Sequence, residues 1–299
     1  MNQNENLHKA LKNKNDEFYT RYEDVEKECS LYAPQFEGKI ILLPADDETS
    51  AFWKYFNDNF EKLKLKGLIA THLEESNSYA LGRSGSTIQT ASLRDNGDFF
   101  GKEVQQSILP LCDIVITNPP FSLFRKIVSS ISSHKKKFLL IANENTIGSK
   151  EIFPMFMNDE IFFGKNSVKS FIQPDGTEKV FGNIIWLTNL ETSHSKKIIP
   201  TALLQNKVFY DNYQAINIDK IKDIPKDYYD VMGVPITYLK KHNPALFQIL
   251  GIASGISRTN KLYGEVVYYP NDKDRGGAPL IDGEIKYTRV FIKRKDNDG

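Results

Sequence analysis

Cysteine is scarce in this sequence, and long apolar stretches are missing from it. The 299-residue chain contains two cysteines, Cys29 and Cys112, without the two-residue spacing of a zinc or redox motif. This excludes a disulfide framework, and we expect no metal site. No apolar stretch reaches the roughly 20 residues needed to cross a bilayer. The amino terminus lacks the basic and apolar regions of a signal peptide, so we expect a cytoplasmic protein without membrane contact.

An excess of charge of either sign is also lacking. The chain has 39 Lys/Arg and 38 Asp/Glu, so the whole molecule is not an obvious binder of polyanions. The distribution is uneven, because residues 1–50 carry 6 basic and 11 acidic side chains, whereas residues 240–299 carry 11 and 7. The basic excess, which includes a run from Lys286 to Lys295 without an acid, suggests a carboxyl-terminal surface for phosphates. A solvated charged face would give the same pattern.

Short apolar runs alternate with amphipathic segments through the first 150 residues. Four runs have the continuous apolar character of strands buried in a parallel sheet: 40–43, 67–71, 113–117 and 138–142. A helix with one apolar face is expected after Thr49 or Ser50, either of which can cap it, and another after the run 113–117. This alternation predicts an α/β protein whose parallel strands are joined by crossover helices.

The rest of the chain has weaker patterns. The polar stretch 74–98 is expected to hold at most one short helix or strand, near 87–93. Hairpin strands at the far edge of the sheet are expected at 161–164, 170–172 and 181–187. Beyond residue 189 the sequence is irregular, with several Gly/Pro breaks. We therefore expect a larger domain over residues 1–190 and a smaller, loop-rich unit over residues 191–299.

The most specific motif is Asn118-Pro119-Pro120-Phe121, directly after the run 113–117. An amino group conjugated with a ring is a poor nucleophile, because its lone pair is delocalised. The side-chain oxygen of Asn118 and the backbone oxygen of Pro119 can accept hydrogen bonds from its two N–H groups, and Phe121 can stack on the ring. This predicts methyl transfer helped by position and electrostatics rather than by proton abstraction. A plain strand-to-helix turn capped by Ser122 is the alternative.

Two further segments have residues suited to a bound cofactor. Gly97-Asp98-Phe99-Phe100 precedes the strand that ends in the proline motif, and its aspartate could bond the amino group of a cofactor adenine. A surface turn is the alternative interpretation. Asp16-Glu17-Phe18-Tyr19-Thr20 could place a ring and a hydroxyl over the cofactor, although a helix cap at Thr20 with ordinary packing would use the same residues.

These motifs, together with Asp46-Asp47 and Phe181-Gly182-Asn183, occur in an order that resembles the adenine-specific DNA methyltransferases of the EcoRI-methylase type. The resemblance implies a Rossmann-like S-adenosylmethionine-dependent methyltransferase fold with a smaller carboxyl-terminal target-recognition unit. It implies methylation of N6 of adenine in a specific duplex DNA sequence, with the target base flipped into the pocket. The four residues of the proline motif would form the catalytic loop. Cofactor contacts would come from Tyr19, Thr20, Asp98, Phe99 and Asn118.

One departure from the pattern concerns the loop after the first strand. Most such enzymes carry a glycine-rich loop there, where the backbone approaches the cofactor. This chain instead has Leu43-Pro44-Ala45-Asp46-Asp47-Glu48. Either aspartate could contact the methionine amino group or the ribose hydroxyls, and the sequence does not decide between them.

Target recognition is the least legible part of the sequence. Reading a duplex needs Lys/Arg for phosphates and polar side chains for base edges. Two carboxyl-terminal loops have this composition, and their candidate residues are Arg258, Asn260, Lys261, Lys273 and Arg275. A cognate restriction endonuclease that forms no stable complex with the chain is an expected partner. Alternatives are a methyltransferase acting on RNA or a protein glutamine, and a catalytically silent DNA-binding protein of the same fold.

Overall fold

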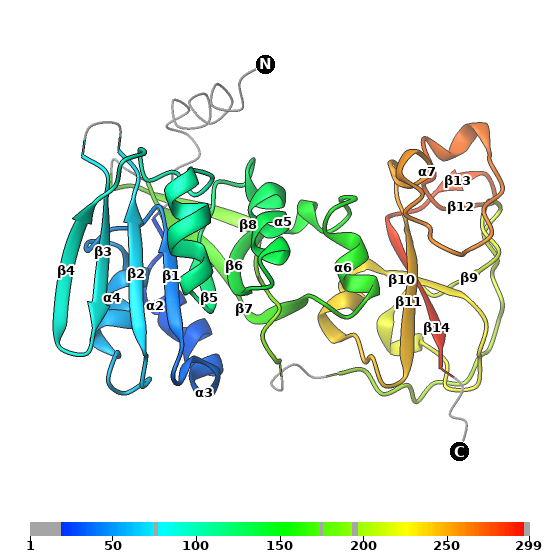
Figure 1. Cartoon of the computed structure of the whole chain (residues 1–299). Helices are drawn as coiled ribbons and strands as arrows, with labels where there is room; N and C mark the ends of the chain where they lie inside the picture. Colours follow the sequence, from blue (N-terminus) through cyan, green and yellow to red (C-terminus); the bar gives the residue numbers. More distant parts are fainter. Residues whose placement is uncertain (1–18, 75–76, 174–175, 193–196, 296–299) are drawn as a thin grey trace. The chain divides into compact units, whose positions relative to one another are not determined.

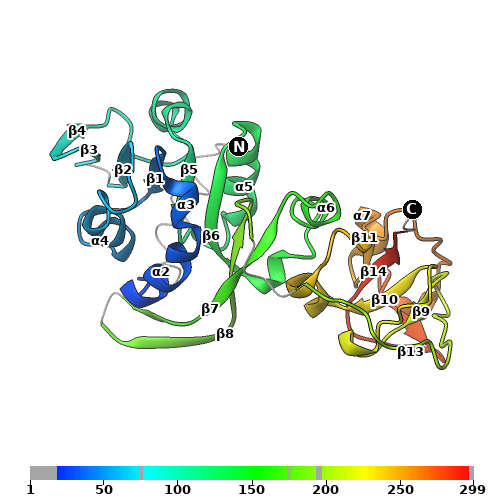
Figure 2. The same cartoon turned by 90° about the horizontal axis from the view of Figure 1, so that it is seen from below.

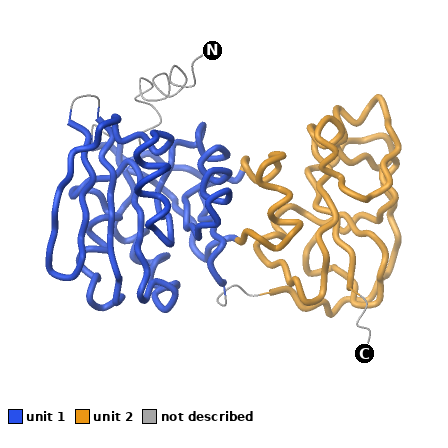
Figure 3. The backbone as a smooth tube through the Cα atoms, in the orientation of Figure 1, with its two compact units in different colours: residues 1–144, 163–194 blue, residues 145–162, 195–299 orange. Residues whose placement is uncertain are grey.

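The chain forms two compact units in a computed structural model, which describes residues 19–74, 77–173, 176–192 and 197–295. Unit 1 comprises residues 1–144 and 163–194, and unit 2 comprises residues 145–162 and 195–299 (Figure 3). The chain therefore passes between the units three times. The boundary expected near residue 190 lies close to the last passage. The structure adds a segment, residues 145–162, that is inserted into unit 1 but belongs to unit 2.

Unit 1 is built on an eight-stranded sheet of order β4-β3-β2-β1-β5-β6-β8-β7 (Figure 1). The central strands β2, β1, β5 and β6 are parallel, which confirms the predicted α/β class. The chain order reverses between β1 and β5, and ligands of open α/β sheets bind at such a switch point. The strands are β1 (Ile40–Pro44), β2 (Gly67–His72), β3 (Tyr79–Ser84), β4 (Thr87–Ser92), β5 (Ile114–Thr117), β6 (Lys137–Asn143), β7 (Phe162–Ile172) and β8 (Glu178–Thr188).

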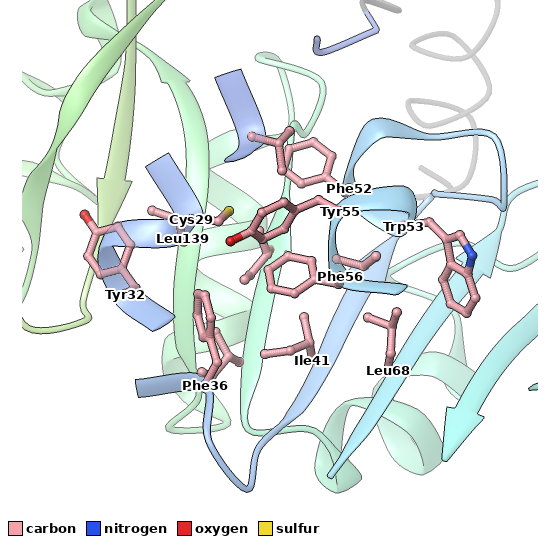
Figure 4. Packing of buried hydrophobic residues seen from close by; sticks show 14 of the residues in the cluster. Cys29, Tyr32, Phe36, Ile41, Phe52, Trp53, Tyr55, Phe56, Leu68 and Leu139 are labelled. Carbon is pink, nitrogen blue, oxygen red and sulfur yellow. The ribbon is translucent and has the colours of Figure 1, made fainter. Parts of the chain in front are cut away.

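Helices cover both faces of this sheet (Figure 2). On one face lie α2 (Tyr22–Cys29), η1 (Ser30–Tyr32), α3 (Ala33–Phe36) and α4 (Ala51–Asp58), and on the other lies α5 (Phe124–Ser133). Helix α4 begins where expected, because the Ser50 hydroxyl accepts a hydrogen bond from Trp53 N at 3.0 Å. Its apolar side chains pack with those of α2 and the sheet in one core, where burial stabilises each by roughly 1.5–3 kcal/mol (Figure 4). The π-helical turn η2 (Val104–Ile108) and the short helix η3 (Leu109–Leu111) also lie in unit 1, and η4 (Glu144–Thr146) spans its boundary with the inserted segment.

Residues 79–92 form an antiparallel hairpin that extends the sheet beyond β2. The sequence prediction of at most one short element here was wrong. All six residues of β4 are exposed, so this strand lacks the apolar alternation that identifies a half-buried strand. The hairpin is instead fixed by Arg83, whose Nη1 donates to the Asn57 backbone and side-chain oxygens at 2.6 and 2.8 Å.

The expected hairpin at the other edge of the sheet is present, with two strands, β7 and β8, of eleven residues each. The two runs expected as separate strands at 161–164 and 170–172 both contribute to β7. Strand β8 pairs antiparallel with β6. The fully buried carboxylate of Glu28 joins α2 to β7, because it accepts hydrogen bonds from Lys165 N at 2.9 Å and Asn166 N at 2.8 Å. This contact fixes α2 to a strand more than 130 residues later in the sequence.

Unit 2 contains a four-stranded sheet of order β11-β14-β10-β9 and a separate small hairpin. Helix α6 of the inserted segment lies against β11, which explains its membership of this unit. The elements are α6 (Phe153–Met157), β9 (Ile216–Asn217), η5 (Ile221–Asp223), β10 (Met232–Pro235), η6 (Ile236–Lys241), β11 (Phe247–Ala253), α7 (Ser257–Asn260), η7 (Asp272–Asp274), β12 (Leu280–Ile281), β13 (Glu284–Ile285) and β14 (Arg289–Arg294).

The basic run near the carboxyl terminus is partly a core strand. Within β14 the residues Val290, Phe291 and Ile292 are fully buried. Arg289 is also buried, and its Nη2 lies 3.3 Å from the Asp219 carboxylate. Arg289 is therefore not available to phosphates, whereas Lys293 and Lys295 of the same run are exposed. Among the described residues, no helix is long and apolar enough to cross a membrane.

Candidate functional site

The carboxyl ends of β1, β2 and β5 are joined by hydrogen bonds from two buried threonines. The Thr117 hydroxyl donates to the Pro44 backbone oxygen at 3.2 Å, and the Thr71 hydroxyl accepts from Ala45 N at 3.3 Å. Asp46 N also donates to the Thr71 backbone oxygen at 3.0 Å. The Asp46-Asp47 loop and the Asn118 loop are therefore neighbours at the switch point of the sheet, where we expect a ligand.

The side chain of Asp46 has an unused acceptor. In the part of the chain that is described, its Oδ2 atom is shielded from solvent and accepts no hydrogen bond. Burial raises the pKa of the Asp46 carboxyl to about 7, the Asp47 charge adds to this effect, and a hydrogen bond from Ser50 opposes it. A buried carboxylate oxygen without a partner costs free energy, so the Oδ2 side of Asp46 fits a ligand that carries a cation or hydrogen-bond donors.

Asp47 differs from its neighbour, because its carboxylate is already paired. Its Oδ1 accepts from the backbone N and the hydroxyl of Thr49 at 2.8 and 2.6 Å, and its Oδ2 lies 3.8 Å from His72 Nδ1. The structure thus separates two residues that the sequence left equivalent. Asp46 has the free acceptor, and Asp47 shapes the loop.

The Gly97-Asp98 segment lies against the carboxyl end of β2. Gly97 has a φ of +73°, and a Cβ atom there would come within 2.2 Å of the His72 backbone oxygen. Only glycine allows this approach. Asp98 follows, and its Oδ1 accepts from Phe100 N at 3.1 Å. The Phe99 side chain is buried and packs edge-on against Phe100. The segment is therefore held one strand away from Asp46.

The loop of residues 118–121 connects β5 to α5. Pro119 is buried, and the half-buried Phe121 packs against the core on the α2/α4 face. The Pro120 oxygen accepts from Leu123 N at 2.9 Å, which closes a turn before the helix. Helix α5 begins at Phe124 with Leu123 as N-cap and no side-chain cap. The alternative in which Ser122 caps the helix is wrong.

The amino-terminal candidates lie on a different element. Tyr19 is 56% exposed and forms a two-bond bridge with Ile172 at the end of β7, at 2.8 and 2.9 Å. The Thr20 hydroxyl oxygen is buried and, like Asp46 Oδ2, has no hydrogen-bond partner among the described residues. The preceding residues of this motif, 16–18, lie outside the described residues.

Sequence reasoning did not single out His72, which ends β2. Its ring stacks on Tyr79 with centroids 4.8 Å apart, and its Nε2 lies 3.6 Å from Glu74. The Tyr79 hydroxyl donates to Glu48 at 2.7 Å, and burial, followed by the Glu48 hydrogen bond, raises the pKa of Tyr79 to about 12. The only sequence feature that could have identified His72 was its position at the end of a predicted strand.

Among the described residues, no group of three His, Cys, Asp or Glu side chains could hold a metal ion.

The two carboxyl-terminal candidate loops pack against each other in unit 2. Arg258 N donates to the Gly276 backbone oxygen at 2.8 Å, and a Cβ at Gly276 would come within 2.2 Å of the Gly255 oxygen. Loop 271–278 is organised by the buried Asp274, which accepts from Gly276 N and Gly277 N at 3.0 Å each. All five candidates are exposed on this pair of loops: Arg258, Asn260, Lys261, Lys273 and Arg275.

Comparison with known proteins gives consistent matches over nearly the whole chain. Residues 6–295 match the family described as "Adenine-specific methyltransferase EcoRI". The chain is 36% identical to the type II methyltransferase M.EcoRI of Escherichia coli, covering 98% of this chain and 97% of that protein. It is 33% identical to the type II methyltransferase M.MpnI of Mycoplasma pneumoniae, covering 97% of this chain and 98% of that protein.

Proposed function

The chain belongs to the EcoRI family of adenine-specific methyltransferases, and from this premise we propose the donor, the residues and the target-recognition unit of its reaction. The activity is adenine-specific methylation of DNA, which requires a methyl donor. The proposed donor is S-adenosylmethionine, which supplies an electrophilic methyl group when bound. The observation that carries the proposal is the buried, unpaired Asp46 Oδ2 at the switch point of the sheet.

Asp46 is the proposed ligand of the methionine ammonium group. A cation is the donor that best compensates a buried carboxylate, since it neutralises the charge as well as filling the acceptor. Asp98, held near the end of β2 by the close approach of Gly97, is the proposed contact of the cofactor adenine amine, beside Phe99. Tyr19 and the unpaired Thr20 hydroxyl are proposed for the amino-terminal side of the same pocket.

The loop of residues 118–121 is the proposed catalytic loop for the target adenine. The Asn118 side-chain oxygen and the Pro119 backbone oxygen accept hydrogen bonds from the two N6–H groups, which localises the lone pair on N6. Phe121 stacks on the flipped base. Asn118 and Pro119 would orient N6 toward the methyl group that the bound donor would supply, and the N6 proton would leave to solvent. No strong base is required, because N6 becomes acidic only after methylation.

Unit 2 is the proposed target-recognition unit. It carries the paired loops with Arg258, Lys261 and Lys273, whose exposed cations can meet phosphates and base edges of duplex DNA. A restriction endonuclease that recognises the same sequence, without forming a stable complex, is the proposed biological partner. The proposed location is the cytoplasm, where the donor and DNA are both available.

One assay tests this function. The chain is incubated with duplex DNA and methyl-labelled S-adenosylmethionine, and the DNA is digested to nucleosides. Label should appear in N6-methyl-2′-deoxyadenosine from the DNA. Label only in the protein, only in RNA supplied in a parallel reaction, or none at all, would refute the proposal.

The catalytic loop is tested by Asn118→Ala. We expect turnover to fall at least a hundredfold, as when a single oxyanion-hole donor is lost, while the affinity for S-adenosylmethionine stays within about twofold of the unmodified chain. Ser122→Ala, in the same loop but at an exposed position without a capping role, is the matched control and should retain turnover. Retained activity in the Asn118→Ala variant would show that the loop has a different role.

A further inference from the structure

The buried carboxylate of Asp274 lies behind the exposed guanidinium of Arg258. We propose that Asp274 is a positioning residue, which holds the Arg258 side chain in a fixed orientation to read a guanine in the recognition sequence. This inference rests on the proposed role of unit 2 in binding DNA and adds to it a specific reading residue, its support and the base that is read.

Asp274 is fully buried, and its carboxylate is surrounded by donors. Its Oδ1 accepts from Gly276 N and Gly277 N at 3.0 Å each, and its Oδ2 accepts a short hydrogen bond from the Tyr268 hydroxyl. Burial opposes ionisation, but the bonds from Tyr268, Gly277 and Gly276, together with Arg258, hold the pKa of Asp274 below its ordinary value. The carboxylate is therefore ionised at neutral pH and fixed in place.

Both the backbone and the side chain of Arg258 contact the loop that contains Asp274. Its backbone N donates to the Gly276 oxygen at 2.8 Å, and its Nη1 lies 3.4 Å from Asp274 Oδ1. The rest of the side chain faces outward, with 47% of its surface exposed. The guanidinium thus faces a buried anion and also bonds the Tyr268 side chain, while its exposed side remains available to a ligand.

This arrangement favours base reading over a simple phosphate contact. Guanine presents two acceptors, O6 and N7, at the spacing of the arginine fork, and an arginine with a fixed plane can bond both at once. A phosphate can be held by a lysine as a point charge, so contact with it does not require the plane of a guanidinium to be fixed. A carboxylate exposed to DNA would repel it. Asp274 avoids this, because it is fully buried and only the cation reaches the surface.

The loop around Arg258 supports such a role. Ser254 N donates to the Ser257 hydroxyl at 2.9 Å, which fixes the turn that leads into α7. On α7 the neighbouring Asn260 is exposed, and an asparagine is the usual partner of adenine edges. Lys261 follows in a left-handed conformation with φ of +51° and ends the helix. The geometry therefore presents a short, rigid reading surface rather than a flexible basic loop.

The experiment first maps the methylated adenines in genomic DNA treated with the unmodified chain, which gives the recognition sequence. Methylation rates and binding are then measured on the cognate duplex and on duplexes with each base pair replaced. Arg258→Ala should lower the discrimination at one G·C pair about tenfold or more, and leave the other positions unchanged. Arg258→Lys keeps the charge but lacks the fork, so it should show the same loss with an unchanged salt dependence of binding.

Asp274→Asn should lower discrimination at the same G·C pair. In a double-mutant cycle, Asp274→Asn should cause no further loss of discrimination in the Arg258→Ala background, because Asp274 acts only by positioning Arg258. The matched control is Asp211→Asn, which weakens the support of the neighbouring turn at Asp282 N and Gly283 N. It should leave the discrimination unchanged.

Three results would overturn the inference. The first is a uniform loss of affinity across all sequences in Arg258→Ala, with a salt slope lower by about 1, which identifies a phosphate contact. The second is an Asp274→Asn effect that persists in the Arg258→Ala background. The third is full discrimination in Arg258→Lys, which needs no Asp274 variant and so stands even if Asp274→Asn does not fold. If unit 2 does not bind DNA at all, Lys261→Ala and Lys273→Ala will also leave affinity and salt slope unchanged.

Discussion

Two adjacent aspartates at the end of β1 have different surroundings, and this difference is the basis for proposing Asp46, rather than Asp47, as the ligand of the cofactor. Asp47 is paired with Thr49 and lies near His72, whereas Asp46 Oδ2 is buried without a partner among the described residues. The chain keeps this acceptor at the point where the sheet reverses its order. A bound cation would supply the missing partner.

The proposed role of Asp46 predicts a pH dependence of cofactor binding. Without ligand its pKa is raised to about 7 by burial, so below that pH the carboxyl is mainly protonated and cannot pair with an ammonium group. Affinity for S-adenosylmethionine should rise with pH through 7 and level off above 8, with binding at pH 6 about tenfold weaker. Calorimetric titration from pH 6 to 8.5 measures this.

Asp46→Asn should remove this pH dependence along with most of the affinity, and Asp47→Asn should keep it. A pH profile that stays the same in Asp46→Asn would exclude Asp46 as the ligand.

Individual site residues could be predicted from the sequence where they belong to one contiguous motif. The loop proposed to be catalytic could be placed between a strand and a helix, because strand, Asn-Pro-Pro-Phe and helix follow one another in the chain. The choice between Asp46 and Asp47 depends on contacts from Thr49 and His72, which no spacing reveals. Arg289 was assigned to a basic surface because its partner, Asp219, is 70 residues earlier in the sequence.

At the scale of elements, the position of the Asp98 segment depends on one close backbone approach. We predict that Gly97→Ala will weaken S-adenosylmethionine binding at least tenfold. A Cβ at Gly97 would clash with the His72 oxygen at 2.2 Å and push the segment away from β2. Gly38→Ala is the control, because Gly38 has a similar φ of +70° but nothing within 4 Å of an added Cβ.

Both variants carry the conformational strain of alanine at positive φ, so only the clash distinguishes them. Thermal unfolding of each variant should be compared with its cofactor affinity. Equal affinities in the two variants would show that the position of the Asp98 segment does not matter for the cofactor.

The parallel strands were predictable because they are buried on both faces and read as continuous apolar runs. The β3–β4 hairpin was not, because β4 is exposed throughout and its pairing depends on the backbone of β3. Its position is fixed by Arg83 and Asn57, a contact between distant segments. Exposed edge strands are stabilised by the neighbours they pair with, and sequence periodicity does not record those neighbours.

At the scale of the whole molecule, one buried histidine ties the inserted segment to the rest of unit 2. His242 Nε2 lies 2.9 Å from Asp159 Oδ1, and its Nδ1 lies 2.9 Å from the Tyr238 hydroxyl. A neutral ring that donates to Asp159 and accepts from Tyr238 satisfies both contacts. Burial lowers the pKa of His242 from 6.5, and this outweighs the opposite effect of Asp159.

This predicts that unit 2 loses stability in mild acid. A histidine with a lowered pKa in the folded state takes up its proton mainly on unfolding, so its contribution is complete above 6.5 and declines as the pH falls through 6.5 towards the folded pKa. The loss has an upper limit of about 1.4 kcal/mol per pH unit. Urea unfolding between pH 5 and 8 measures it. In the His242→Gln variant, the free energy of unfolding should depend less on pH. An equally steep pH dependence in that variant would show that other groups cause the loss of stability.

The division of the chain was predictable only in outline. A change of texture near residue 190 is visible in the sequence, because regular strands give way to irregular segments. Residues 145–162 carry no such signal. Their helix α6 has ordinary apolar residues, and only its packing against β11, about 90 residues later, assigns it to unit 2.

The interleaving of the two units has a consequence for how new specificities can arise by recombination. A single crossover near residue 194 would exchange most of unit 2 between two relatives. The resulting protein would have α6 from one parent and β11 from the other. The buried Phe153 and Phe156 of α6 would then meet side chains with which they did not co-evolve. A functional chimaera therefore requires two exchanges, one of residues 145–162 and one of residues 195–299. If the exposed loops of unit 2 read the DNA as proposed, point substitutions on them are the easier route to a new recognition sequence.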